Sequence, residues 1–287
     1  MRSVMLAVLL LTSVFAFSQV MTDSILIEGH YRNFRFNKPL ATGKNPALFF
    51  ILHGSGGSAE GMMKNTTRIE SVAAKENVII VYPEGYHHFW NECRKASNAE
   101  ANLQNINENE FFSQMINYFS GRYKIDFRKV FVAGFSGGGH MAYKLALTMP
   151  DKISAIAAIV ANQPEPAWSD CTEARIARPV LIINGTKDAT NPYDGGEMFV
   201  NNASFGVVKS TEGTFRYWAG LAGYTGEPKK RLLPDTDPAD NKTIEAYTFK
   251  AKGKPEITLL KVIGGHHDYP NDIDVYVYAW EFFKRQK

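Results

Sequence analysis

The sequence predicts one doubly wound α/β domain, in which helices cover both faces of a mainly parallel sheet. The first observation is a series of continuous apolar runs, the pattern of strands that are buried on both faces. The second observation is that helical patterns separate these runs along the chain, with no internal repeat or linker between them. The predicted strands lie at residues 47–53, 77–83, 129–134, 153–161, 179–185 and 257–264.

The helices are predicted from apolar residues that recur three and four positions apart, which places them on one face. This spacing is clearest within residues 112–119, 141–149 and 273–280. Ahead of the first buried strand, residues 24–36 alternate between apolar and polar side chains. Such alternation predicts an antiparallel pair of strands at one edge of the sheet.

Composition excludes one class of partner. Hydrophobic residues make up 45% of the chain and charged residues 21%, which is ordinary for a globular protein. The net charge of +3 is small for 287 residues and is not gathered into a basic run. Binding to nucleic acid therefore has no electrostatic basis in the sequence.

The N-terminus has the layout of a secretory signal. Arg2 precedes an apolar stretch from Val4 to Phe17, and Ala16-Phe17-Ser18 offers small residues for cleavage. The stretch is too short to span a bilayer, although an uncleaved anchor is the alternative. We expect residues 1–18 to be a signal peptide and residues 19–287 to form one domain, exported to the periplasm or medium without stable membrane insertion.

The chain contains two cysteines, Cys93 and Cys171, both in polar loop sequence. In an exported protein, two loop cysteines favour a disulfide over two free thiols. No metal-ligand spacing accompanies them, and adjacent histidines such as His87-His88 point in different directions on most backbones. The sequence therefore predicts a disulfide and no metal site.

Residues that suit catalysis follow four of the predicted strands. Ser136 follows the strand at 129–134, Asp188 follows 179–185, and His266-His267 follow 257–264. A Gly-Ser-Gly-Gly run at residues 54–57 follows the strand at 47–53. In open α/β sheets, ligands bind at the carboxyl ends of the strands, so we expect these groups to share one edge.

The glycine-rich surroundings of Ser136 predict a nucleophile on a sharp strand-to-helix turn. Gly134, Gly137 and Gly138 relieve crowding around a strained residue, and the helix N-terminus favours negative charge. The order serine, acid, histidine is the one that an α/β-hydrolase uses. Backbone N–H groups of Gly137 and of Ser55 or Gly56 would then form the oxyanion hole.

With these motifs the chain resembles the polyhydroxybutyrate depolymerase and feruloyl esterase group of serine esterases, including carbohydrate esterase family one. The resemblance rests on "LHGSGGS", "DFRKVFVAGFSGGGHMAYKLA", "NGTKDATNPYDGG" and "GGHHDYP", and it runs from about residue 30 to the C-terminus. It implies a single-domain α/β-hydrolase fold and ester hydrolysis without a cofactor. It also implies that the nucleophile is Ser136, the acid Asp188 and the base His267.

Two of these assignments have rivals. Asp194 lies six residues after Asp188 and is the alternative acid. The family's histidine motif reads Gly-Gly-Gly-His-x-Trp-Pro, so alignment on Pro270 selects His267 and places Tyr269 at the tryptophan position. Because His266 then replaces a glycine, His266 is the alternative base. His140, just after Ser136, is expected to be a helix or pocket-wall residue.

Aromatic residues near the predicted site have two interpretations. Tyr86, Phe89 and Trp90 follow the second buried strand, so they either line a substrate cleft or cover a small core of their own loop. Trp168, close to Cys171, has the same two interpretations. Together with Tyr269, we take Tyr86, Trp90 and Trp168 as candidate pocket residues.

The function that these observations predict is a secreted serine carboxylic-ester hydrolase of the feruloyl or acetylxylan type. Its partner would be an ester substrate, free or linked to a polysaccharide, and the sequence does not specify an oligomeric state. A polyhydroxybutyrate depolymerase is the first alternative, and a peptidase of the same fold is another. The last is a catalytically silent hydrolase fold used for binding, whose expected sign is the loss of a triad residue.

Overall fold

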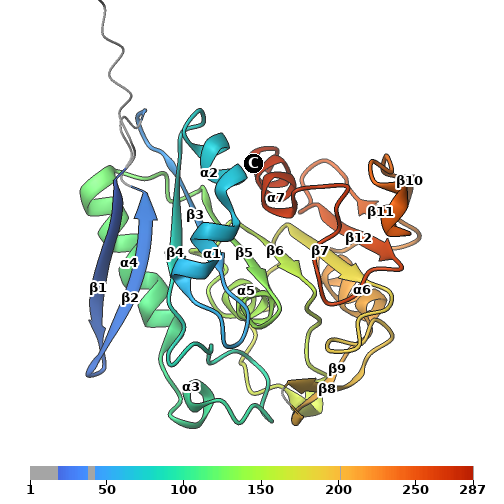
Figure 1. The fold of residues 1–287 in the computed structure, drawn as a ribbon, viewed down its shortest axis with the longest axis horizontal. Coiled ribbons are helices and arrows are strands. Elements are labelled where there is room, and N and C mark those ends of the chain that lie inside the picture. Colours follow the sequence, from blue (N-terminus) through green and yellow to red (C-terminus); the bar gives the residue numbers. More distant parts are fainter. Residues whose placement is uncertain (1–18, 38–42, 201, 287) are drawn as a thin grey trace, which may run out of the picture.

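The structure is a computed structural model that describes residues 19–37, 43–200 and 202–286. Its centre is a ten-stranded sheet that runs across the whole molecule, from β1 at one edge to β10 at the other (Figure 1). The strands lie in the order β1 (Val20–Ile27), β2 (His30–Asn37), β4 (Val78–Pro83), β3 (Ala47–Leu52), β5 (Val130–Phe135), β6 (Ala155–Ile159), β7 (Val180–Gly185), β12 (Ile257–Ile263), β11 (Thr243–Phe249) and β10 (Lys229–Leu232).

The six central strands, from β4 to β12, are parallel. Every residue of β3, β4, β6 and β7 is buried, which explains their continuous apolar sequence. All six predicted buried strands are present, and the predicted antiparallel pair is β1 and β2, with Ile27 opposite His30. The predicted α/β class is therefore confirmed.

Helices cover both faces of the sheet and enclose two hydrophobic cores. One core receives side chains of α4 (Glu108–Tyr123), α5 (Gly137–Thr148) and α6 (Thr211–Leu221). The other receives side chains of α1 (Ala59–Asn65), α2 (Thr67–Ala73) and α7 (Val275–Lys284). The short α3 (Glu100–Leu103) and the turns of 3₁₀ helix at Pro166–Trp168 and Pro238–Asp240 lie in connections. None of the described helices is long and apolar enough to cross a membrane.

Two antiparallel elements have no counterpart in the predictions. The strands β11 and β10 extend the sheet beyond β12, and β10 consists of four exposed residues, Lys-Lys-Arg-Leu. A separate hairpin is formed by β8 (Gly196–Val200) and β9 (Ala203–Val208). The hairpin and α3 both lie at the lower side of Figure 1, away from the main sheet. The four exposed residues of β10 lack the apolar periodicity on which sequence prediction depends.

Candidate active site

Ser136 lies at the turn between β5 and α5, in a strained backbone conformation with φ 51° and ψ −116°. A non-glycine residue at positive φ is uncommon and costs roughly 1–3 kcal/mol, so the surrounding structure must hold it in place. The neighbouring glycines make the turn possible. A Cβ atom at Gly134 would collide with the backbone of Gly138, and one at Gly138 would lie 2.6 Å from the carbonyl oxygen of Leu52.

The structure brings Ser136, His267 and Asp188 together in one line of hydrogen bonds. The Oγ atom of Ser136 lies 2.9 Å from Nε2 of His267. On the other side of the ring, Nδ1 of His267 lies 2.7 Å from Oδ2 of Asp188. Since a carboxylate only accepts hydrogen bonds, Nδ1 carries the proton and Nε2 is free to accept one from the serine hydroxyl.

Asp188 is held in place by its own loop after β7. Its Oδ1 atom accepts hydrogen bonds from the backbone N–H groups of Thr190 and Asn191, each at 2.8 Å. The side chain is fully buried, whereas that of His267 is 22% exposed. The carboxylate is therefore fixed, and the imidazole that it orients still faces the surface.

The rival residues lie elsewhere. His266 and Asp194 are exposed, and neither bonds to Ser136 or His267. His140 is only 2% exposed, and burial lowers its pKa well below the ordinary histidine value, so this ring stays neutral. The geometry therefore singles out Asp188 and His267 from the alternatives that the sequence left open.

The three residues predicted for the oxyanion hole differ in whether their backbone N–H groups are already hydrogen-bonded within the protein. The N–H of Gly56 donates to the carbonyl oxygen of His88 at 2.9 Å, so it is occupied. Within the described part of the chain, the N–H groups of Ser55 and Gly137 donate to no protein acceptor. The two residues are also close, because a Cβ atom on Gly137 would lie 3.0 Å from the backbone nitrogen of Ser55. Ser55 and Gly137 thus fit the role, and Gly56 does not.

The four candidate pocket residues lie in different environments. Trp90 is a correction: it is 2% exposed, its ring lies against that of His53, and its Nε1 donates to the carbonyl oxygen of His53, so it belongs to the core. Tyr86 is half-buried and bonds to Gln104. Trp168 is 38% exposed and lies against Gly206. Tyr269 borders the triad, because its ring centroid is 4.7 Å from that of Phe135.

Sequence reasoning missed Phe135, which lies in the site, and the role of Asn184, which supports the strand ends beneath it. The ring of Phe135 lies 5.4 Å from that of His267, so it forms an apolar wall beside the base. Asn184, at the end of β7, bonds to both backbone groups of Ala161 and to the side chains of Asn162 and Thr211. These bonds fix the ends of β6 and β7 side by side. A polar residue inside an apolar strand was the available signal.

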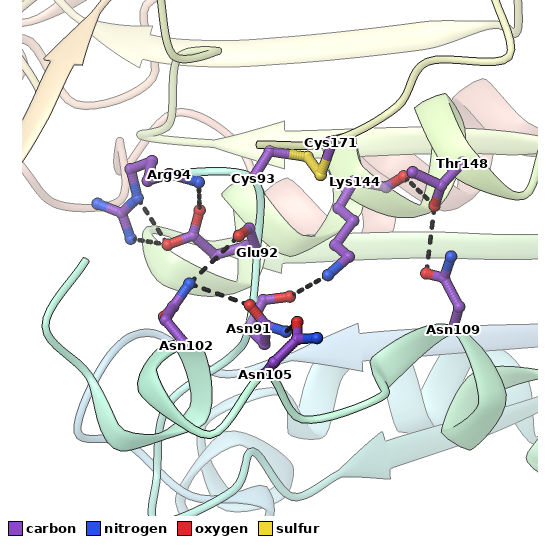
Figure 2. Close-up of a disulfide and its surroundings, with 10 residues drawn as sticks. All are labelled: Asn91, Glu92, Cys93, Arg94, Asn102, Asn105, Asn109, Lys144, Thr148 and Cys171. Carbon is purple, nitrogen blue, oxygen red and sulfur yellow. Dashed lines mark hydrogen bonds and ion pairs between the residues drawn. A yellow bond between two sulfur atoms is a disulfide. The ribbon is translucent and has the colours of Figure 1, made fainter. Parts of the chain in front are cut away.

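A disulfide joins Cys93 to Cys171, as predicted, and closes a loop 78 residues long (Figure 2). A crosslink of this span contributes about 4 kcal/mol in the chain-entropy model. Buried polar contacts support the same segment: Glu92 pairs with Arg94, both 2% exposed, and Nζ of Lys144 donates to the carbonyl oxygen of Asn91 at 2.6 Å. The segment after β4 is therefore firmly anchored next to the site.

A cavity of about 360 Å³ lies between this segment and the β8–β9 hairpin. Its walls are mainly apolar, and they include Phe89, Val200 and Phe205. Asn98 and the ion pair between His87 and Glu100, 2.9 Å apart, supply polar groups. The His87–Phe89 wall belongs to the same turn whose His88 carbonyl bonds to Gly56, so this turn connects the cavity to the loop that carries Ser55.

Comparisons with known proteins find esterases among the relatives of this chain. Feruloyl esterase B of Piromyces equi is 26% identical over 81% of this chain, which spans 41% of that protein. Acetylxylan esterase A of Aspergillus oryzae is 23% identical over 70% of each chain. The solved acetyl xylan esterase from Aspergillus awamori superposes with a TM-score of 0.63 at 15% identity, over 92% of this chain and 99% of its own, which shows a shared fold.

A family profile identifies the chain more directly. The profile described as alpha/beta hydrolase fold matches residues 49–193, about half of the chain. The matched region runs from β3 through Ser136 and Asp188 and ends just before β8. The chain belongs to the α/β-hydrolase fold family, and its esterase relatives make it a carboxylic ester hydrolase.

Proposed function

We propose that the protein is a secreted serine esterase that removes acyl groups from plant cell-wall polysaccharides by means of a Ser136–His267–Asp188 triad. The observation that carries the proposal is the unbroken line of hydrogen bonds from Ser136 Oγ through His267 to Asp188, at 2.9 and 2.7 Å. A serine hydroxyl is a poor nucleophile unaided, and an adjacent oriented base is what activates it.

In the acylation step, Nε2 of His267 takes the Ser136 proton while Oγ attacks the ester carbonyl carbon. The electron pair of the carbonyl moves to its oxygen, which accepts hydrogen bonds from the N–H groups of Ser55 and Gly137. Each such donor is worth about 3 kcal/mol in the transition state. The intermediate collapses as the bond to the alcohol oxygen breaks and His267 returns its proton to that oxygen.

Deacylation repeats these steps with water. His267 takes a proton from water as the water oxygen attacks the acyl carbon, and the same N–H groups receive the second oxyanion. The bond to Ser136 Oγ then breaks, the serine recovers its proton from His267, and the carboxylic acid leaves. Asp188 stabilises the charged imidazole in both steps, because the buried carboxylate lies 2.7 Å from Nδ1.

The relatives and the cavity support the proposed substrate class. The relatives are named as feruloyl and acetylxylan esterases, so acyl esters of xylan are the natural candidates. The cavity of about 360 Å³, one wall of which is the turn that bonds to Gly56, has phenylalanine walls and a few polar groups, which suits an aromatic acyl ring. We therefore favour feruloyl esters over simple acetyl esters.

A panel of esters tests this proposal. Methyl ferulate should be hydrolysed with a kcat/KM at least tenfold above that of methyl butyrate, because an apolar ring gains roughly 1.5 kcal/mol or more on burial. Acetylated xylan and a short hydroxybutyrate oligomer complete the panel. Hydrolysis of the oligomer alone would contradict the xylan assignment and identify a polyester depolymerase.

Export is the second part of the proposal. Its support is the signal-like sequence of residues 1–18, which lie outside the described residues, together with the disulfide. The exported protein should begin at Gln19 and take up no alkyl group when alkylated without reductant. Intact-mass analysis checks both points, and a retained N-terminus with two alkylated thiols would contradict export.

A further inference from the structure

The segment Glu84–Trp90, here called the support segment, follows β4 and lies against the loop His53–Ala59, here called the oxyanion loop. Three hydrogen bonds of 2.9 Å join the two segments. The N–H of Gly85 donates to Nε2 of His53, Nε1 of Trp90 donates to the carbonyl oxygen of His53, and the N–H of Gly56 donates to the carbonyl oxygen of His88. The support segment therefore fixes the position of the oxyanion loop.

The carboxylate of Glu84 contacts both the oxyanion loop, at Ala59, and the support segment, at His88. Its Oε2 accepts the N–H of Ala59 at 2.8 Å, where the oxyanion loop enters α1. Its Oε1 lies 3.1 Å from Nδ1 of His88, and the same Nδ1 lies 2.9 Å from the carbonyl oxygen of Gly57. Since both partners of Nδ1 are acceptors, this nitrogen carries the proton. One carboxylate thus fixes the loop directly at Ala59 and indirectly through His88.

The turn that carries His88 is strained. His87 and His88 have φ values of 48° and 70°, and the N–H of Phe89 closes the turn on the carbonyl oxygen of Tyr86 at 3.0 Å. The left-handed conformation costs an ordinary residue roughly 1–2 kcal/mol, so two in a row need compensation from contacts. The bonds of His88 to Gly56, Gly57 and Glu84 supply that compensation.

The buried side chain of His53 also links the oxyanion loop to the support segment. The ring is 2% exposed, and Nδ1 donates to the carbonyl oxygen of Gly54 at 2.8 Å while Nε2 accepts from Gly85. Both bonds require the neutral ring, and burial, the main cause, lowers the pKa of His53. Ser55 lies between His53 and Gly56, so its N–H direction depends on contacts made on both sides of it.

We infer that Glu84 is a positioning residue for ester hydrolysis, which keeps the Ser55 N–H directed at the oxyanion through Ala59 and His88. The inference rests on the proposed function, because it concerns the donors of the same site. A positioned donor matters most in the transition state, where charge develops on the carbonyl oxygen. The loss of Glu84 should consequently lower kcat far more than it raises KM.

The experiment compares Glu84→Ala with Glu84→Gln on the full chain. Glu84→Ala should lower kcat roughly 100-fold with KM within threefold, since a displacement of about 1 Å costs this much. Phenylboronic acid, whose serine adduct is tetrahedral, should bind to it more weakly by a similar factor. Glu84→Gln should lose less than about tenfold, because one amide oxygen serves one of the two donors. Glu60→Ala, an exposed carboxylate next to Ala59, is the matched control and should match wild type.

The contrary results are distinct. A Glu84→Ala enzyme with kcat within threefold of wild type, or with lowered kcat and unchanged boronic acid affinity, would overturn the inference. If Glu84→Ala does not fold, His88→Gly decides: it keeps the left-handed turn and the carbonyl but removes the imidazole. A loss in kcat of at least threefold supports the inference, and wild-type kcat overturns it. An active Ser136→Ala variant would instead contradict the proposed function.

Discussion

Ser136→Ala is expected to lower kcat/KM by about 10⁴-fold or more, with the fold unchanged. The change removes only the oxygen that lies 2.9 Å from Nε2 of His267, so no acyl-enzyme can form. Removal of a triad residue normally leaves only the smaller rate enhancement of the oxyanion hole and substrate binding. The measurement is steady-state hydrolysis of methyl ferulate, with circular dichroism to verify folding.

The matched control is Ser71→Ala, which removes an exposed hydroxyl in α2 that donates to the carbonyl oxygen of Thr67. Its activity should equal that of wild type. A Ser136→Ala enzyme that keeps more than about one hundredth of wild-type activity would remove Ser136 from the mechanism, because no other group replaces a nucleophile so well.

His267→Ala should match Ser136→Ala in severity, whereas His266→Ala should lose less than about tenfold. The two residues are adjacent, yet only His267 bonds to both Ser136 and Asp188, and His266 is exposed. Each variant is therefore the control for the other, with equal changes in size and charge. If His266→Ala suffered the larger loss, the triad geometry described above would not be the working one.

The sequence predicted the fold's central part well because its strands are apolar on both faces. The predicted runs at 47–53 and 179–185 correspond to β3 and β7, whose every residue is buried. The edge strand β10, at the opposite side from the predicted β1–β2 pair, was not predictable in this way. In β10, Lys229, Lys230 and Arg231 are exposed and carry no period-two pattern, so pairing with β11 alone makes this segment a strand.

The candidate site likewise has one part that the sequence predicts and another that it does not. The sequence predicted that Ser136, Asp188 and His267 lie close together, because each follows a strand and parallel strands bring their carboxyl ends to one edge. The role of Trp90 was not decided by the sequence, because an aromatic residue in a polar loop suits either a pocket or a core. Its partner His53 lies 37 positions earlier, and only the folded chain shows that the indole bonds to that backbone.

The contacts of Glu84 were equally hidden. They join residues 59, 84 and 88 around a turn of two left-handed histidines, a conformation that sequence patterns assign to asparagine and glycine. Local strain supported by tertiary contacts is what prediction from sequence misses, and such strain is common near functional sites.

The most direct test of the central claim, that Ser136 is the nucleophile of an ester hydrolase, is labelling with a fluorophosphonate followed by peptide mass analysis. We predict one label per chain, on the peptide that contains Ser136, with loss of esterase activity in proportion to labelling. His267→Ala should label far more slowly, because the base that activates the hydroxyl is gone. Labelling of another serine, or no labelling of a folded protein, would contradict the claim, and the second result would identify a silent hydrolase fold used for binding.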